Sequence, residues 1–472
     1  MGGDQRACRL VGVLFVLVTV VLGCPTVTCA QAPSSFLGSV PTGQATEAAI
    51  DLSLREAFER ALKYNLGAIE GRETLRAVHA TRLRSLNALL PNLLGRVSEA
   101  SSQINLKALG VNLSIPGVSV PTVVGPFNVT DARAYLTAEI FNWSDLKGLK
   151  ASAESERASQ YSYKNDREVV VLTTGNAYLL VISDLASVDS IRAQVTTAQT
   201  LYQQGVDKNA NGVIARIDVL RAQVELQTQQ QRLIAAENQL NIDKLTLARV
   251  IGLPNGQAFR VTDSVPYRPP ADTSLDQALA RAYSTRPDYL GAKAQVRAAE
   301  LALEAAGAEA YPYSSLSADY GEIGNPNFGA SHGTYSVTVG LTVPIFQGSR
   351  VRADTLQAAS ALEQRKAELS DLGGRIDDQV RTAFYNLKSA SELVAVARSN
   401  IQLADQTVIQ AQDRFAAGVA DNLEVVQAQE SVASANQSYL ASLYAFNLAK
   451  LALAQALGVA EQSAATYLLG GN

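Results

Sequence analysis

The chain repeats one pattern twice, and this repetition limits the possible folds more than any other feature of its sequence. The segment 54–66 matches 275–290 at an offset of 221 residues. Further along the chain the offset is 206 residues, which pairs Gly212 with Gly418 and Gly252 with Gly458. One register held over so much of the chain predicts two copies of a single structural unit.

Each copy contains segments in which apolar and polar residues alternate, as in a β-strand. The clearest is 335–345, where every odd position is apolar or aromatic, and its counterpart is 132–140. The expected partners are 96–106, which alternates poorly, and a shorter segment near 316–320. The longest of these segments fits a tilted strand that spans a membrane. Half-buried strands of a soluble sheet have the same period, so the strands alone leave both possibilities open.

Two long helices follow the strands in each copy. Residues 144–204 and 349–417 contain no proline, and at 1.5 Å per residue each helix would be roughly 90 Å long. After a turn at Gly212 or Gly418, a second helix of about 40 residues returns with an unbroken seven-residue repeat, which predicts coiled-coil packing. The first repeat includes the polar residues Gln229 and Asp243, which are unusual for a dry core. We interpret them as tolerated surface positions; a wet face or hydrogen bonds between helices are the alternatives.

These patterns predict a mainly α fold with a membrane β part, in which a strand–strand–long helix–long helix unit occurs twice. Four strands need other copies to close a barrel, because the smallest bacterial membrane barrels have eight; two chains would give eight strands and three would give twelve. Aromatic residues at the strand-to-helix junctions, Phe141, Trp143 and Phe346, fit a membrane girdle, although Trp143 also fits a buried core.

The expected boundaries are a signal peptide at 1–30, an extension at 31–51, a first repeat at 52–254 (hairpin about 93–141, long helices about 144–251), a linker at 255–273, a second repeat at 274–458 (hairpin about 313–346, long helices about 349–457) and a tail at 459–472.

The first 30 residues have the features of an export signal. Arg6 and Arg9 precede an apolar run over 10–22, which is too short for a membrane helix. We expect cleavage after Ala30; lipid attachment at Cys24 is the alternative, because residues 21–24 resemble a bacterial lipobox. We expect no later segment to reach the roughly 18 to 20 apolar residues of a membrane helix, so the exported chain is either soluble outside the cytoplasm or a β-barrel in the outer membrane.

The residue inventory argues against catalysis, metal binding and nucleic-acid binding. The net charge is −4 and all three cysteines lie within the first 30 residues, so a basic stripe and cysteine-based sites are not expected. His79, in a helical segment, and His332, in a glycine-rich loop, have no second ligand nearby. Asn112 and Asn128 match a glycosylation pattern, but two matches in a chain of this length are expected by chance. Both lie in a segment at 106–131, which we expect to be a loop that a barrel would place outside the cell. We expect no enzymatic activity, no cofactor and no metal.

The sequence resembles the TolC-like outer-membrane efflux proteins over essentially its whole length after the signal. The resemblance is carried by LSLREAFERAL near the start, LLPNL before the first strand, VPIFQGSR at a strand-to-helix junction, and the helix-return segments NGVIARIDVLRAQ and AGVADNLEVVQAQ. It implies a homotrimer in the outer membrane, in which a twelve-stranded β-barrel continues into a twelve-helix α-barrel in the periplasm. It also implies a passive exit duct for efflux or type I secretion, with a periplasmic adaptor (a membrane fusion protein) and an inner-membrane transporter as partners.

The resemblance places the periplasmic mouth of the channel at the two helix returns. The tips that would contact the adaptor are Gly212, Val213, Gly418 and Val419.

The resemblance also implies residues of a pore aperture. The two acidic positions of a cation-attracting ring fall on Glu424 and Gln427, so one acid is missing, and Asp421 would add to the field of the ring. An acid of the closing contact falls on Asp218, but Phe415 replaces the tyrosine that it would meet and an alanine replaces the arginine, which puts the polar lock in doubt. Without the resemblance, Glu424 would be read as an ordinary solvated helix residue.

A periplasmic coiled-coil adaptor or scaffold is the alternative to a channel, because it would share export and long heptad helices. It predicts one helical hairpin between compact β-domains. The sequence instead has two hairpins, each preceded by alternating strands, which favours the channel.

Overall fold

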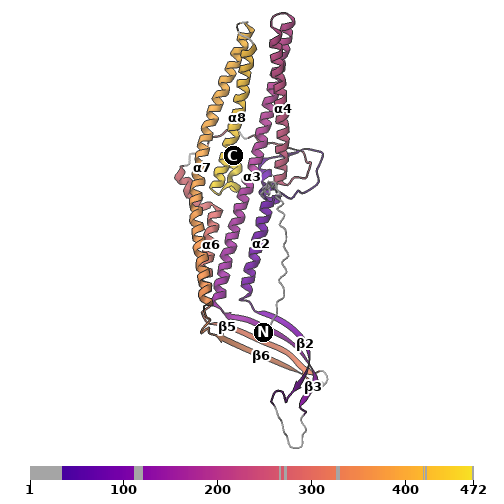
Figure 1. Cartoon of the computed structure of the whole chain (residues 1–472), viewed down its shortest axis with the longest axis vertical. Coiled ribbons are helices and arrows are strands. Elements are labelled where there is room, and N and C mark those ends of the chain that lie inside the picture. The colour runs from indigo at the N-terminus through magenta and orange to yellow at the C-terminus, as the bar shows by residue number, and fades with distance from the viewer. Residues whose placement is uncertain are drawn as a thin grey trace, which may run out of the picture. The chain divides into compact units, whose positions relative to one another are not determined.

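The computed structural model describes residues 35–110, 121–264, 267–269, 274–325, 330–417, 419 and 422–469. The expected export signal, its cleavage position, Cys24 and Asn112 lie outside this part of the chain. The fold is mainly α, as predicted (Figure 1). In chain order the elements are η1 (Ser35–Leu37), β1 (Ile50–Leu52), α1 (Leu54–Tyr64), α2 (Leu66–Asn87), β2 (Asn92–Asn105), β3 (Val123–Phe141), α3 (Trp143–Ala210), α4 (Arg216–Ile251), β4 (Phe259–Val261), α5 (Leu275–Thr285), α6 (Pro287–Ala308), β5 (Tyr313–Asn325), β6 (Ala330–Thr342), α7 (Arg350–Ala416), α8 (Asn422–Ala456) and α9 (Ala460–Leu469).

The two halves of the chain have the same order of elements: two shorter helices, two antiparallel strands and two long helices. Equivalent helices begin and end alike. Ser53 and Ser274 each start a helix with a capping box, which satisfies backbone N–H groups of the first turn. Gly252 and Gly458 follow α4 and α8 with φ of +71° and +68°, the left-handed conformation that glycine adopts without steric cost. These local signals explain why both copies fold into the same unit.

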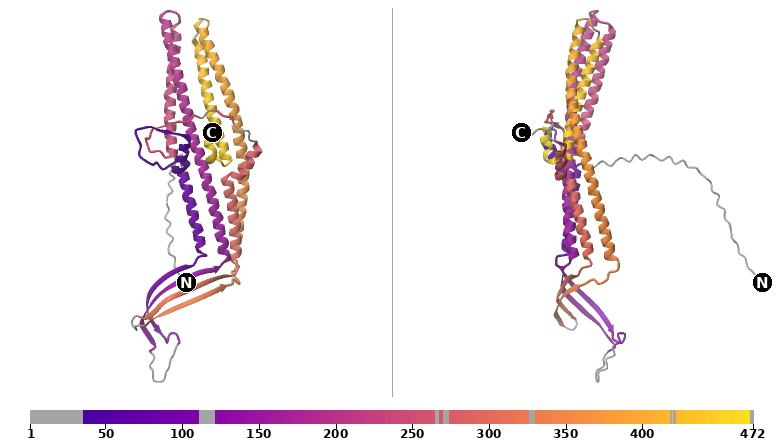
Figure 2. Two further views of the ribbon diagram at one scale, coloured as in Figure 1. Left: turned by 180° about the vertical axis from the view of Figure 1, so that it is seen from behind. Right: turned by 90° about the vertical axis from the view of Figure 1, so that its left-hand side faces the viewer.

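Two hydrophobic clusters hold the long helices together. One contains buried residues of α1, α3, α4, α8 and α9, and the other contains residues of α5, α7 and α8. The heptad repeat of α4 contributes to the first cluster and that of α8 to the second, and each repeat residue is buried or half-buried. The two antiparallel pairs α3–α4 and α7–α8 form the hairpins seen in Figures 1 and 2.

The interpretation of Gln229 and Asp243 as surface positions is wrong, because both side chains are buried. Each makes a hydrogen bond along α4. The Gln229 Nε2 atom donates to Glu225 Oε1 at 2.7 Å, and the Gln239 Nε2 atom donates to Asp243 Oδ2 at 2.8 Å. A buried polar group keeps its place when it has such a partner.

The four long strands form one antiparallel sheet in the order β2-β3-β5-β6. The central contact, between β3 and β5, joins the first copy to the second. In the sheet, β2 and β6 are the edge strands. The chain enters the sheet from α2 and α6 and leaves it into α3 and α7, so the sheet lies at one end of these four helices (Figure 1).

Three expectations about the strands are wrong in their bounds. β6 ends at Thr342, although the alternation continues to 345, because its partner β5 begins at Tyr313 and offers nothing further to pair with. β5 is as long as β6, at 13 residues each. β3 begins at Val123, inside the segment expected to be a loop, because pairing with β2 extends it.

Among the helices that the structure describes, one is long and apolar enough to cross a membrane by length and composition alone, contrary to the expectation that no such segment exists. It is α3, with an 18-residue window of mean hydropathy 1.6. The same helix supplies Val170, Val171, Tyr178 and Val181 to the first hydrophobic cluster. Packing against other helices therefore accounts for its apolar character.

Short elements fasten the middle of the long helices. β1 pairs in parallel with β4, which links the extension before the first copy to the linker after it. Asp263, just after β4, accepts hydrogen bonds from the backbone N–H of Leu54 at 2.6 Å and from the hydroxyl of Tyr178 at 3.1 Å. The start of α1 is thereby fixed to the buried face of α3.

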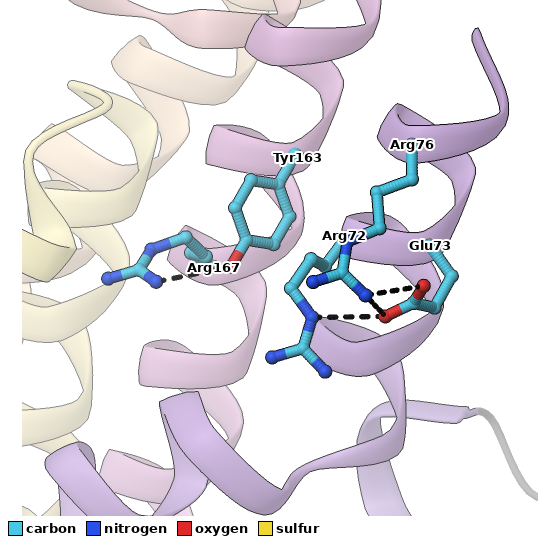
Figure 3. A network of polar contacts seen from close by, with 5 residues as sticks. All are labelled: Arg72, Glu73, Arg76, Tyr163 and Arg167. Atoms are coloured by element: carbon cyan, nitrogen blue, oxygen red, sulfur yellow. Dashed lines mark hydrogen bonds and ion pairs between the residues drawn. The ribbon is translucent and has the colours of Figure 1, made fainter. Parts of the chain in front are cut away.

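The last helix, α9, is attached to α3 by polar contacts. The Glu168 carboxylate accepts hydrogen bonds from the backbone N–H groups of Ala460 and Glu461, which begin α9. Arg167 pairs with the Glu461 carboxylate. Arg167 also donates a hydrogen bond to the Tyr163 hydroxyl at 3.4 Å, as Figure 3 shows. Burial raises the pKa of Glu168 to about 7, although these backbone N–H groups favour its charged form.

Candidate functional site

The two helix returns close with the same hydrogen bond. After α3, Gly212 has φ +72° and the Val213 N–H donates to the Lys208 carbonyl at 2.9 Å. After α7, the Val419 N–H donates to the Arg414 carbonyl at 3.0 Å, while Gly418 lies outside the described residues. Such a bond ends a helix when the residue between adopts a left-handed conformation. Val213 and Val419 are each 68% exposed, so each return presents an exposed valine.

Two of the predicted aperture residues, Glu424 and Asp218, are paired with cations of the same chain. Glu424 begins α8, and its Oε1 atom is 3.3 Å from the Arg414 Nε atom at the end of α7. Asp218 begins α4, and its Oδ1 atom is 3.3 Å from the Arg221 Nη1 atom. Gln427 is exposed on α8, whereas Asp421 and Ala420 lie outside the described residues. Pairing weakens the field that Glu424 and Asp218 produce.

Phe415 contacts the other hairpin. The Lys208 ammonium, at the end of α3, lies 4.2 Å from the centre of the Phe415 ring at the end of α7. Such a cation–π contact is worth about 0.5–1 kcal/mol at an exposed site. Phe415 also packs against a small cluster of Ala411, Val425 and Ala428, to which Leu201 of α3 adds. The two hairpins therefore touch close to their returns.

Sequence reasoning missed Lys208 and Arg414, although a signal for both was available. The 206-residue offset places Lys208 directly over Arg414, so each hairpin has a basic residue in the last turn of its first helix. Arg414 binds Glu424 and Lys208 binds Phe415. The basic residue at this duplicated position thus contacts a predicted aperture residue in both copies, through an ion pair in one and a cation–π contact in the other.

One face of the sheet is apolar and exposed. Residues that pair across neighbouring strands lie on the same face, and one such row contains Leu93, Leu136, Ala318 and Val337. On β6, Val337, Val339 and Leu341 are 65%, 66% and 71% exposed. We name the surface formed by these odd-numbered positions of β6 and their partners the apolar face. A monomeric soluble protein rarely exposes such a surface.

Aromatic residues lie on either side of the apolar positions 337, 339 and 341 of β6. Tyr320 and Tyr335 pair directly across β5 and β6 and are exposed, a pair that sequence reasoning did not single out. At the helix end, the Phe141 and Trp143 rings are 6.0 Å apart and Phe346 is exposed. Trp143 is exposed, so its interpretation as a core residue is wrong. Aromatic residues at two levels are typical of a transmembrane barrel.

The opposite face of the sheet is polar. Its rows include Arg96 opposite Arg133, and Thr137 opposite Ser317, which in turn is opposite Thr338. We name this surface the polar face. An apolar face and a polar face on the same strands match lipid on one side and water on the other.

The remaining candidates are structural. The His79 Nδ1 atom lies 3.0 Å from Glu156 Oε1, and Arg82 binds the same carboxylate, so His79 does have a neighbouring acid, contrary to expectation. His332 and Asn128 lie in β6 and β3 rather than in loops. Within the described part of the chain, no group of three or more histidine, cysteine, aspartate or glutamate residues could hold a metal ion.

Comparison with known proteins agrees with this geometry. Residues 127–253 and 276–459 match the outer membrane efflux protein family. The chain is 22% identical to the outer membrane protein TolC of Escherichia coli (strain K12) over 343 residues, 70% of each protein. It is 26% identical to the pyoverdine export outer membrane protein OpmQ of Pseudomonas aeruginosa over 429 residues, 87% of this chain and 86% of OpmQ.

Solved structures show the same fold. The outer membrane protein VceC of Vibrio cholerae superimposes with a TM-score of 0.70 at 18% identity, covering 86% of this chain and 96% of VceC. The alternative of a periplasmic adaptor is therefore wrong, since two hairpins share one sheet and the family match spans both copies. The protein is located in the outer membrane and acts in export, and the chain belongs to the outer membrane efflux protein family.

Proposed function

We propose that three copies of this chain form a passive exit duct, in which a twelve-stranded β-barrel continues into a twelve-helix α-barrel. The observation that carries the proposal is the four-stranded sheet with open edges at β2 and β6. A sheet inside a membrane must close, because unpaired backbone groups have no water to bind there. Pairing β6 of one copy with β2 of the next closes the barrel, and three copies leave room for water inside.

The long helices carry matching surfaces for the same assembly. Exposed apolar residues follow the solvent side of α4, where Val224 and Ile234 lie, and of α7, where Val396 and Ile409 lie. Val224 lies eight residues after the start of α4 at Arg216, and Ile409 seven residues before the end of α7 at Ala416. Both helices reach their returns at these ends, so the two stripes occupy the same level. We infer that α4 of one copy packs antiparallel to α7 of the next.

Disulfide trapping tests this packing sharply, because residues 31–472 contain no cysteine. In the full chain, Val224→Cys together with Ile409→Cys should give dimers and trimers on oxidation. The matched control combines Val224→Cys with Leu356→Cys, which is exposed on the same helix but far from the return, and it should give only monomers. Equal cross-linking in both proteins, or none in either, would contradict the proposed trimer.

The returns are proposed to contact a periplasmic adaptor, which in turn binds an inner-membrane transporter. The support is the pair of exposed valines, Val213 and Val419, which lie at the helix returns and make equivalent backbone hydrogen bonds. The relative OpmQ is named for pyoverdine export, which fits a duct that serves a pump. Changing both valines to aspartate should lower export while leaving the trimer in the membrane, as measured by drug efflux and by unheated gels.

The mouth is proposed to select cations weakly. Three copies would bring Glu424 close to a common axis, where like charges attract cations within about a Debye length of 10 Å at 0.1 M salt. Arg414 offsets part of this charge. In planar bilayers, Glu424→Gln should reduce cation selectivity, and Asp421→Asn should reduce it further. Unchanged reversal potentials in the double variant would place the ring elsewhere.

A further inference from the structure

A single arginine organises the polar face of the sheet. Arg133 on β3 binds the Asp131 carboxylate with two nitrogen atoms, and its Nη1 atom lies 3.2 Å from the Asp319 Oδ2 atom on β5. The Arg133 guanidinium also lies 5.4 Å from the centre of the Tyr135 ring. These contacts hold the side chain flat across two strands rather than projecting away from the sheet.

The backbone of β5 makes room for this arrangement. Gly321 pairs directly with Arg133, and a Cβ atom at Gly321 would lie 2.6 Å from the Arg133 Cα atom and 2.7 Å from its Cγ atom. The side chains of Arg133, Asp131 and Asp319 are only 24%, 20% and 18% exposed. We name these three residues the charged triad. It is a fixed, half-buried unit with one positive and two negative charges.

Arg96 stands beside the charged triad but takes no part in its ion pairs. It is directly opposite Arg133 on the edge strand β2, it lies on the same polar face, and it is exposed. Two like charges in this position repel each other, which the carboxylates of the triad offset. Among the residues that the structure describes, no carboxylate lies within ion-pair distance of Arg96. Together, Arg96 and the triad carry two positive and two negative charges.

We propose that Arg96 sets the ion selectivity of the barrel end of the channel. The proposal rests on the trimer proposed above, in which the polar face lines the water-filled interior. With Arg96, each copy adds no net charge at this level, so small anions and cations both pass. Without Arg96, three charged triads leave three net negative charges around one lumen, which would concentrate cations and repel anions. Arg96 is thus the residue that keeps the exit open to anionic solutes.

Reversal potentials test the proposal with the full-length protein in planar bilayers under a potassium chloride gradient. Arg96→Gln should raise the ratio of potassium to chloride permeability severalfold, Arg96→Glu should raise it more, and Arg96→Lys should restore the parent value. The matched control is Glu99→Gln, three residues along β2 and on the opposite face, which should change nothing.

The outcomes separate this proposal from the trimer. If the parent protein forms trimers and channels but Arg96→Gln and Arg96→Glu both keep its permeability ratio, the assignment of Arg96 is wrong and the trimer stands. If Glu99→Gln changes the ratio as much as Arg96→Gln does, the assignment of the two faces is wrong. If the parent protein gives neither trimers nor channels, the proposed duct itself fails. If Arg96→Gln assembles poorly, the permeability ratios of Arg96→Lys and Arg96→Glu can be compared with each other instead.

Discussion

The contact between Glu168 and α9 makes a prediction about how stability depends on pH. Glu168 is 6% exposed and accepts hydrogen bonds from two backbone N–H groups of α9. Burial raises its pKa from the ordinary value of 4.5 to about 7. The folded chain therefore keeps a proton between these values that the unfolded chain has already released. We expect replacement of Glu168 by glutamine, which keeps an acceptor oxygen without the charge, to remove this dependence.

The size and sign of the effect follow from the two pKa values. Because the folded chain binds more protons in this window, its free energy of unfolding falls as the pH rises from 4.5 to about 7. Each pH unit is worth about 1.4 kcal/mol, so the loss approaches about 3 kcal/mol per chain. The full stabilisation is present below pH 4.5, and none of it is left well above pH 7. Glu168→Gln should match the parent at low pH and exceed its stability at high pH.

Thermal unfolding of the detergent-solubilised protein, followed by circular dichroism, measures the difference. The Tm of Glu168→Gln should equal that of the parent at about pH 4 and exceed it at about pH 8. Glu168→Ala provides the comparison, because it removes the acceptor as well and should cost about 1 kcal/mol for the lost helix cap at low pH. If the difference in Tm between Glu168→Gln and the parent is the same at both pH values, the reasoning about Glu168 is refuted.

Three further predictions concern the sheet and the returns. Val339→Arg on the apolar face should cost about 2–4 kcal/mol per chain and reduce trimer bands on unheated gels, whereas Thr338→Arg on the polar face should assemble nearly normally; equal assembly of the two would reverse the faces. Gly321→Ala, whose Cβ would lie 2.1 Å from a backbone oxygen of β3, should also reduce trimers, and Gly333→Ala, where the space is empty, should not. Gly212→Val should strain a backbone with φ +72° and lower drug efflux while leaving the barrel in the membrane, and unchanged efflux would argue that the tip lies elsewhere.

The sequence allowed prediction of features that depend on local chemistry. The 206-residue offset identified both helix-ending glycines of α4 and α8, because a left-handed residue after a helix is a property of that position alone. The burial of the heptad repeats followed in the same way. Strand bounds were harder, since β6 stops where β5 no longer offers a partner, and alternation within one segment carries no information about its neighbour.

Contacts between residues far apart in the sequence could not be predicted from such patterns. Arg133 and Asp319 are 186 residues apart, and only the pairing of β3 with β5 brings them together. Glu168 meets the start of α9 across 292 residues. No period or motif in either segment refers to the other, so the charged triad and the helix cap became visible only in three dimensions. Lys208 and Arg414 differ, because the repeat itself aligns them.

The open edges of the sheet also determine how the protein must be made. A single exported chain carries two unpaired strand edges and an apolar face, a combination that invites aggregation before the barrel closes. If three chains must meet, the rate of closure rises more steeply than in proportion to their concentration. A modest fall in synthesis would then lower the number of finished ducts disproportionately and lengthen the time that each chain depends on chaperones. The cell would control export through the supply of monomer as well as through the pump.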